Sequence, residues 1–398
     1  MGNLLDTISN FKKSPADPLE LIHVIEKDKN IDCNKIRLLI KSGIDINEHD
    51  SYNITALMLV AKHEGEHAVE MMRILIDAGA DINKQYNNGR NALMLTAMNK
   101  SENNEAMMRM LIKAGADVNA QENNDGWTAL ILVAGHADKN AVSKMHALIE
   151  AGAEIDKKNH EGMTALMHAS WLGGEHAEAK IQALINAGAD VNAINEYGTT
   201  ALMLAVGNRH VHSKDMIQTL IKAHADVNKQ NSNGFTAMMY AAGNRHVHAE
   251  AIMRILIDAD SDANKQNFKG WTAMMYAVTS EIKIAESKIL LLIKAGADVD
   301  AQQEDGLTAL MLAARYWGDA TEMMLAKDMV RAIIYAGANV DIRANNGKTA
   351  KDIGGSLFCG FIQQLKLEMR TLVKGVDNTM ITNHSSGGGG GGGSGAHP

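Results

Sequence analysis

The sequence has few prolines, few cysteines and no long apolar run. Only three of its 398 residues are proline, and two of them, Pro15 and Pro18, precede the main body of the chain. A long stretch without proline suits stacked helices, because proline breaks a helix interior. Cys33 and Cys359 lie far apart, which argues against a secreted disulfide framework and against a metal or redox motif. We therefore expect a reducing, cytoplasmic compartment.

Signatures of membrane insertion, nucleic-acid binding and catalysis are also missing. No stretch approaches roughly 18 uninterrupted apolar residues, and the N-terminal MGNLLDTISNFKK lacks the apolar centre of a signal peptide. The net charge is −8, and Lys and Arg are scattered, which argues against nucleic acid as the main ligand. There is no GxxxxGK[ST] loop, no GxGxxG after a strand, no HExxH and no Gly-x-Ser-x-Gly elbow. We expect no enzyme activity and no cofactor.

What the sequence does contain is an internal repeat. Its marker, Gly-x-(Thr/Asn)-Ala-(Leu/Met), recurs with one spacing of 37 residues followed by spacings of 36, at Gly89, Gly126, Gly162, Gly198, Gly234, Gly270 and Gly306. An earlier copy starts at Asn53, and a later one starts at Gly347. Self-similarity at such a period predicts a solenoid, in which each unit buries its apolar face against its neighbours.

Each unit divides into two expected helices, as the copy at Gly126 illustrates. Thr128 is placed to cap a first helix, and apolar residues follow it at helical spacing. A polar break leads to a second helix over residues 142–149, after which Gly152 is suited to the left-handed conformation that closes a helix. A polar segment then turns the chain into the next unit.

These features resemble the ankyrin repeat family over residues 19–370. The Gly-x-Thr-Ala-Leu starts and the Gly-Ala-Asp-Val-Asn ends carry the resemblance, the latter at Gly79, Gly115, Gly188 and Gly296 with small variations. About nine to ten repeats are present. The sequence has Thr-Ala-Leu-Met where the family has Thr-Pro-Leu-His, and a period of 36 residues where the family has 33. The resemblance implies an all-α solenoid of stacked helix pairs joined by short β-hairpin-like loops.

The same comparison of copies predicts the domain organisation. We expect an N-terminal arm at 1–18, an ankyrin array with atypical capping repeats at 19–370, and a disordered glycine-rich tail at 371–398. An amphipathic stretch from Phe358 to Val373 is expected to cover the end of the stack. The recurring hairpin asparagine, as at Asn83, is expected to brace its own turn. In the family such an asparagine is also a substrate of asparaginyl hydroxylation.

By the resemblance, the chain is a non-enzymatic protein–protein interaction scaffold that binds a partner through a concave groove. The groove would be lined by the residue after each repeat glycine, the hairpin tips and the ends of the first helices. That predicts a partner-binding set in which aromatic and Arg anchors supply affinity: Arg90, Trp127, Met163, Trp171, Tyr197, Phe235, Phe268, Trp271, Leu307, Arg315, Tyr316 and Trp317. His160 is a further hairpin-tip residue. We expect a monomer whose negative charge favours a partner with basic patches.

Two alternatives remain open at this point. Ankyrin arrays occur in pathogen- or virus-type effectors, which recruit a host protein. The second alternative is a metal-binding array, because His210 and His212 recur as His246 and His248 in identical Gly-Asn-Arg-His-Val-His strings. No Cys or carboxylate completes a tetrahedral set there, so a solvated turn copied by duplication is the simpler explanation.

Overall fold

The structure is a computed structural model that describes residues 17–27, 32–174, 176–208, 213–318 and 320–384. Over these residues it contains helices and one isolated antiparallel bridge between His49 and Thr55, with no strand. The chain divides into two compact units, residues 1–233 and 234–398. The expectation of an all-α solenoid is confirmed. In the described ranges no helix is both long enough and apolar enough to span a bilayer.

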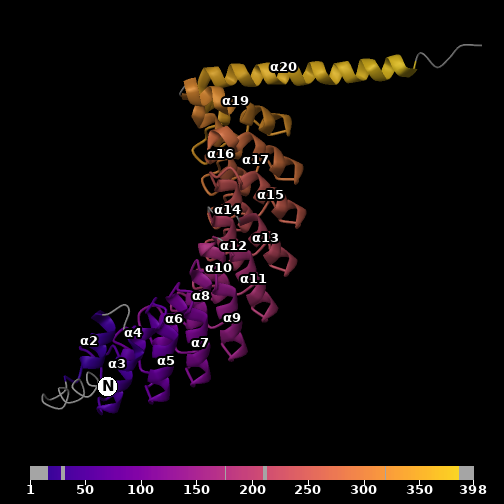
Figure 1. The fold of residues 1–398 in the computed structure, drawn as a ribbon. Coiled ribbons are helices and arrows are strands. Elements are labelled where there is room, and N and C mark those ends of the chain that lie inside the picture. The colour runs from indigo at the N-terminus through magenta and orange to yellow at the C-terminus, as the bar shows by residue number, and fades with distance from the viewer. Residues whose placement is uncertain (1–16, 28–31, 175, 209–212, 319, 385–398) are drawn as a thin grey trace, which may run out of the picture. The chain divides into compact units, whose positions relative to one another are not determined.

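Helix pairs follow one another along each unit (Figure 1). The helices of unit 1 are α2 (Glu20–Lys27), α3 (Cys33–Lys41), α4 (Ala56–Ala61), α5 (Ala68–Asp77), α6 (Ala92–Met98), α7 (Asn104–Lys113), α8 (Ala129–Gly135), α9 (Ala141–Glu150), α10 (Ala165–Leu172), α11 (Ala177–Asn186), α12 (Ala201–Gly207) and α13 (Ser213–Lys222). Those of unit 2 are α14 (Ala237–Gly243), α15 (Ala249–Asp258), α16 (Ala273–Thr279), α17 (Ile282–Lys294), α18 (Ala309–Ala314), the short 3₁₀ helix η1 (Arg315–Gly318), α19 (Ala320–Tyr335) and α20 (Ala350–His384).

Within each unit the first helices pack on first helices and the second helices on second helices. In unit 1, α4, α6, α8, α10 and α12 pack in succession, and α3, α5, α7, α9, α11 and α13 form the parallel row. Unit 2 repeats this with α14, α16 and α18 beside α15, α17 and α19. The core between the rows is rich in Met, Leu and Ala, including fully buried Met71, Met107 and Met216. No single pair is independently stable, since each covers its neighbour's apolar face.

The first helices begin as the sequence predicts. The capping Thr128 has an extended backbone, and its hydroxyl accepts a hydrogen bond from the amide of Ile131 at 3.2 Å. The same cap recurs through the array, with Asn91 in place of threonine before α6. Each side chain satisfies one of the backbone donors that the first turn of a helix leaves free.

The second helices end in a left-handed residue. Gly152 has φ 87°, as expected for the residue that follows a helix and closes it. Two repeats do not have glycine there: His224 has φ 65° and Asp260 has φ 60°. A side chain in this conformation brings Cβ close to the backbone, so these two positions carry local strain.

Consecutive hairpins are joined through their backbones, which fixes the spacing of the tip residues. His160 N donates to Asp125 O at 2.8 Å, and Glu196 N donates to Glu161 O at 3.2 Å. The repeat glycine permits this approach. A Cβ on Gly162, which has φ 74°, would lie only 2.8 Å from Glu196 N. Glycine is therefore required at this position for two reasons: the positive φ, and the close approach of the next hairpin's backbone.

The hairpin asparagines link successive repeats, so the prediction that they brace their own turns is wrong. Asn83 Nδ2 donates to Gly115 O at 3.0 Å, and Asn83 Oδ1 accepts from Asp117 N at 2.8 Å. An aspartate two residues earlier braces the turn itself, since Asp81 Oδ1 accepts from Asn83 N at 3.0 Å. One amide side chain thus satisfies a donor and an acceptor of the next repeat.

The ends of the array differ in part from the predicted boundaries. Residues 1–16 of the expected arm lie outside the described residues. At the other end the expected boundary at 370 falls inside α20, which runs as helix to His384 with a kink at Gly355 (φ 69°). The glycine-rich residues 385–398 also lie outside the described residues. Phe358, Ile362 and Leu365 are buried, so this helix closes the stack as predicted.

Candidate functional site

The residues expected to bind a partner separate by exposure. The exposed fractions of Trp171, Tyr197 and Phe268 are 50%, 60% and 74%, and Arg315 is also exposed. The half-buried members are Arg90, Trp127, Phe235, Trp271 and Tyr316. His160, at a hairpin tip, is exposed as well.

Three members of the expected set lie in the interior instead. Met163, Leu307 and Trp317 are 4%, 8% and 5% exposed. Met163 and Leu307 follow a repeat glycine, a position that is half-exposed in some repeats and buried in others. Trp317 is buried because it packs on Phe358 and Phe361. These three have almost no surface for a partner to contact, and we leave them out of the binding surface.

A row of rings occupies the hairpin side of the first helices in unit 2. The repeats that start at Gly234 and Gly270 each supply one ring from the residue before the capping threonine and one from four residues after it. Phe235 contacts Tyr240 with ring centroids 5.3 Å apart, and contacts Tyr276 of the next repeat at the same distance. Trp271 contacts Tyr276 at 5.2 Å. The four half-buried rings therefore form one continuous surface, which we call the ring row.

A single asparagine orients the centre of the ring row. Asn267 Nδ2 donates to the hydroxyl of Tyr276 at 2.9 Å, and Asn267 Oδ1 accepts from the amide of Trp271 at 2.9 Å. Burial raises the pKa of the Tyr276 phenol, although the hydrogen bond from Asn267 opposes this. The phenol is therefore protonated at neutral pH. Phe268, which follows Asn267 directly in the sequence, is exposed.

The rings of unit 1 are fewer and centre on a histidine. His168 takes the place in α10 that tyrosines take in unit 2, and its ring lies 4.9 Å from Trp127 and 6.3 Å from Trp171. Burial lowers its pKa to about 4, so the imidazole is neutral at physiological pH. Asn159 Nδ2 lies 3.5 Å from Nε2, and Nδ1 is buried without a hydrogen-bond partner in the described structure.

The aromatic stretch Arg315 to Trp317, which follows α18, helps to hold the C-terminal helix. Trp317 meets Phe358 edge-on with centroids 4.8 Å apart, and Phe361 at 5.4 Å, so it anchors α20 on η1. The Tyr316 hydroxyl donates to Val278 O at 3.3 Å, at the end of α16. Of Arg315, Tyr316 and Trp317, Arg315 alone is exposed.

The histidine candidates for a metal site are placed only in part. His210 and His212 lie outside the described residues. His246 is exposed and His248 is half-buried and precedes α15. Over the described ranges, no three His, Cys, Asp or Glu side chains are grouped so that they could hold a metal ion.

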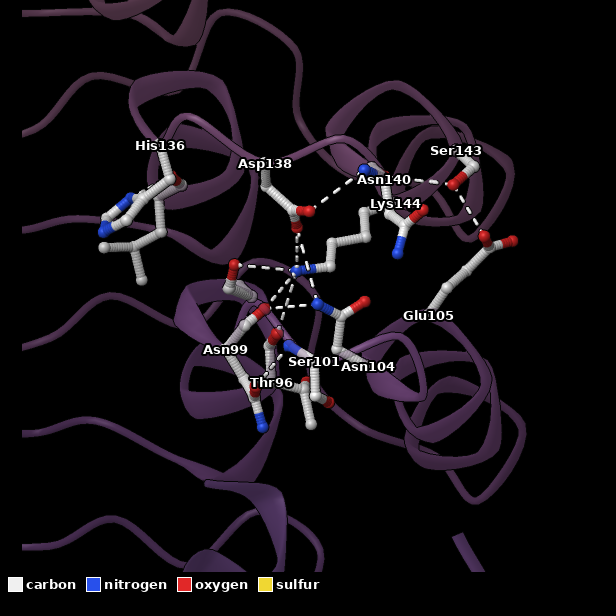
Figure 2. Close-up of polar contacts among 12 residues, drawn as sticks. Thr96, Asn99, Ser101, Asn104, Glu105, His136, Asp138, Asn140, Ser143 and Lys144 are labelled. Carbon is white, nitrogen blue, oxygen red and sulfur yellow. Dashed lines mark hydrogen bonds and ion pairs between the residues drawn. The ribbon is translucent and has the colours of Figure 1, made fainter. Parts of the chain in front are cut away.

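Three fully buried lysines were not predicted from the sequence. Lys144, Lys180 and Lys288 are each no more than 1% exposed. Figure 2 shows the first: its ammonium lies 2.6 Å from Asp138 Oδ2 and donates to Asn99 O at 2.8 Å, at the end of α6. Burial alone would raise the pKa of Asp138, but the hydrogen bonds from Lys144 and from the amide of Asn140 outweigh it, so the pKa lies below its usual value.

The other two lysines make the same kind of contact without a carboxylate in hydrogen-bond reach. Lys180 Nζ donates to Ala134 O at 2.7 Å, at the end of α8. Lys288 Nζ donates to Ala242 O at 2.9 Å, at the end of α14. Burial lowers the pKa of both lysines to about 8. Each ammonium satisfies carbonyls that the last turn of a first helix leaves free.

The sequence carries a signal for these lysines in two positions eight residues apart. Where the earlier position is Asn, the later one is apolar, as in Asn99 with Met107, Asn208 with Met216 and Asn244 with Ile252. Three repeats have another residue at the earlier position and Lys at the later one: His136 with Lys144, Leu172 with Lys180 and Ser280 with Lys288. The repeat with His63 and Met71 has neither Asn nor Lys. The exchange between Asn and Lys becomes visible when the repeats are aligned with one another at these two positions. Catalytic motifs do not cover these positions.

Comparison with known proteins agrees with the repeat geometry. A family model of three ankyrin repeats matches residues 21–122, 68–145, 135–230 and 210–287, and a model of a single ankyrin repeat matches 305–345. Among solved structures, the ankyrin repeat domain of Bcl-3, a member of the IkappaB protein family, is 22% identical. The match covers 61% of this chain and 99% of that one, with a TM-score of 0.49. No curated protein matches the sequence.

Proposed function

The chain belongs to the ankyrin repeat family, and from that premise we propose that it is a scaffold that binds a partner protein through the ring row of unit 2. Ankyrin repeats in general are protein–protein interaction modules. The ring row gives this chain a specific surface for that task, with Phe268 and Arg315 as further exposed side chains of unit 2 and with Trp127 and Trp171 as rings of unit 1. We propose that the chain acts as a monomer and without catalysis.

The observation that carries the proposal is the partial exposure of four packed rings. Phe235, Tyr240, Trp271 and Tyr276 contact one another, yet none is fully buried. Folding alone does not require that four adjacent rings stay partly exposed. Contiguous exposed apolar patches mark interaction sites. Tyrosine and tryptophan are also the side chains enriched among the few residues that dominate binding energy. Because Asn267 holds Tyr276 in place, the surface is ordered before a partner arrives and little entropy is lost on binding.

The chemistry of the surface describes the partner. Its contacting segment would be apolar, with an acceptor for the hydroxyl of Tyr276. The net charge of −8 favours a partner that also carries basic patches, since complementary charge speeds the encounter. An effector that recruits a host protein would use the same ring row. The bound protein would then come from the host, whereas an ordinary scaffold would bind a protein of its own organism.

The test is quantitative affinity capture with matched variants. Full-length wild type is compared with Phe235→Ala/Trp271→Ala, and with Leu367→Ala, which removes an exposed apolar side chain from α20. Circular dichroism and melting curves check that each variant is folded. We expect a protein captured by wild type and by Leu367→Ala, and a loss of about tenfold or more in affinity for the ring variant. Equal capture by all three chains would rule out the ring row.

A further inference from the structure

A pocket in unit 1 combines positive charge with an apolar wall. It has a volume of about 370 Å³ and lies between the end of α4, the following hairpin and the end of α6. Lys62, Arg90 and Lys100 line it together with Tyr86, Leu95 and Met98. Glu64 is its only acidic lining residue, so the lining carries three cations and one anion, a net charge of +2. The local charge is thus opposite to that of the whole chain.

One nitrogen donor of this pocket has no acceptor in the described part of the chain. Arg90 Nε is buried and makes no hydrogen bond. Lys62 and Lys100 are exposed and add two positive charges to the lining. Leaving a buried donor without a partner costs about 1–3 kcal/mol. Such groups are rare in folded proteins and call for an explanation, and an absent ligand is one.

An adjoining pocket adds a further unpaired donor. His63 lines it, and the two pockets share Lys62 and Glu64. His63 Nδ1 lies 3.0 Å from the amide of Gly65 and accepts its hydrogen bond, so the neutral ring carries its proton on Nε2. Nε2 is buried and has no partner among the described residues. Two buried donors, Arg90 Nε and His63 Nε2, therefore belong to the same pair of pockets.

The nearby carboxylate of Glu122 does not fill this role. It lies close enough for its charge to interact with Arg90. Its oxygens, however, accept the amides of Asn124 at 3.2 Å and Asp125 at 2.6 Å, and it is 1% exposed. The interaction between Glu122 and Arg90 is therefore one of charge alone, and the donor on Arg90 Nε stays unused.

We propose that this pocket binds an acidic segment of a partner protein. A carboxylate side chain of that segment accepts from Arg90, with Lys62 and Lys100 beside it, and an apolar neighbour packs on Leu95 and Met98. Guanidinium and carboxylate form charge-assisted hydrogen bonds of matched geometry. The apolar wall and the volume favour a peptide over a free inorganic anion. This contact lies in unit 1 and does not depend on the ring row of unit 2.

The test uses a fluorescein-labelled peptide of alternating glutamate and leucine and the full-length protein. Fluorescence anisotropy measures its binding to wild type, to Arg90→Gln and to Lys62→Gln/Lys100→Gln. The matched control is Lys41→Gln/Lys113→Gln, which removes two exposed lysines that do not line the pocket. We expect each pocket variant to weaken binding by about tenfold or more, and the control to change it less than about twofold. A peptide with glutamine in place of glutamate should not bind.

A second readout separates binding at the pocket from a general charge effect. In a ¹⁵N-resolved NMR spectrum, one arginine Nε–H signal that is absent from Arg90→Gln should shift when the glutamate peptide is added to wild type. No binding by wild type, or equal loss in the control variant, would overturn the proposal. Displacement of the peptide by inorganic phosphate alone, or binding of a phosphoserine peptide only, would show a phosphate site instead. The ring variant Phe235→Ala/Trp271→Ala should bind the acidic peptide normally, so failure of either proposal is seen separately.

Discussion

Lys180 and Asn208 bring a nitrogen donor to the same point of consecutive repeats, the carbonyl end of the first helix before them. Lys180 Nζ lies 2.7 Å from Ala134 O, and Asn208 Nδ2 lies 2.8 Å from Trp171 O. The two donors come from different elements, one from the second helix and one from the turn before it. The backbone carbonyls at a helix end need donors, and the array supplies them from more than one side chain. Lys180 and Asn208 represent two such donors, and the Tyr316 hydroxyl, which donates to Val278 O, is a third.

The first prediction exchanges one donor for the other. In Lys180→Met, Ala134 O loses its donor, while Met fills the position as it does in other repeats. Adding Leu172→Asn, which restores the Asn–Met combination of Asn208 and Met216, should return the missing hydrogen bond. We expect a favourable coupling of about 1–2 kcal/mol between positions 172 and 180, measured by urea unfolding of the two single variants and the double variant.

The matched control for this cycle is Lys222→Met, an exposed lysine at the end of α13. It should change the free energy of unfolding by no more than about 0.5 kcal/mol. Additive effects of Leu172→Asn and Lys180→Met would mean that the two side chains do not serve the same carbonyls.

The second prediction concerns pH. The folded-state pKa of Lys180 is about 8, below the unfolded value of about 10.4. Between these values the unfolded chain binds more protons, so the contribution of Lys180 to stability rises with pH and is lost as pH falls toward 8. The slope is at most about 1.4 kcal/mol per pH unit for one group.

Urea unfolding at pH 8, 9 and 10 checks this. The stability difference between wild type and Lys180→Met should move in favour of wild type as pH rises. Taking the difference removes other groups that titrate in this range, such as Lys288, whose pKa burial also lowers to about 8. A difference that stays constant with pH would show that Lys180 keeps an ordinary pKa in the fold.

The third prediction repairs a link between repeats. Asp156 occupies the place of the linking asparagine, and both its oxygens accept from Asp190 N at 3.1 Å. A carboxylate has no N–H for Gly188 O, whereas Asn119 Nδ2 donates to the matching Gly152 O at 3.1 Å. Asp156→Asn should therefore raise the free energy of unfolding by about 1 kcal/mol. Asn119→Asp should lower it by a similar amount, and thermal melts at pH 7 compare the pair.

Much of the fold was predictable because the repeat compares the chain with itself. The caps at Thr128 and its equivalents, the closing glycines and the covering role of Phe358 all follow from local rules that every copy repeats. The donor exchange between Asn208 and Lys180 was also present in the sequence. It was missed because a lysine within an otherwise apolar helix pattern is ordinarily taken for a solvent-exposed residue.

The candidate site was less predictable, for a geometric reason. The position after the repeat glycine places Trp271 half-exposed but buries Met163 and Leu307. The spacing of the repeats locates this residue along the chain. The exposure of its side chain depends on how the hairpin of the next repeat packs against it. Tyr240 and Tyr276 were not singled out, since a tyrosine one turn into a helix is usually a core residue. Only the ring contacts show that they extend the surface.

The last prediction removes strain at the end of a second helix. His224 adopts φ 65° where most repeats have glycine, and its contact with the preceding repeat is made by its backbone: Asn192 Nδ2 donates to His224 O at 3.1 Å. His224→Gly keeps that hydrogen bond and relieves the left-handed backbone, so the free energy of unfolding should rise by about 1 kcal/mol. The converse change, Gly188→Ala, places a Cβ that meets nothing within 4 Å at φ 90°, so its cost is purely conformational and should be of the same size. Urea midpoints that move in opposite directions for the two variants would establish that backbone strain, and not lost packing, sets the difference.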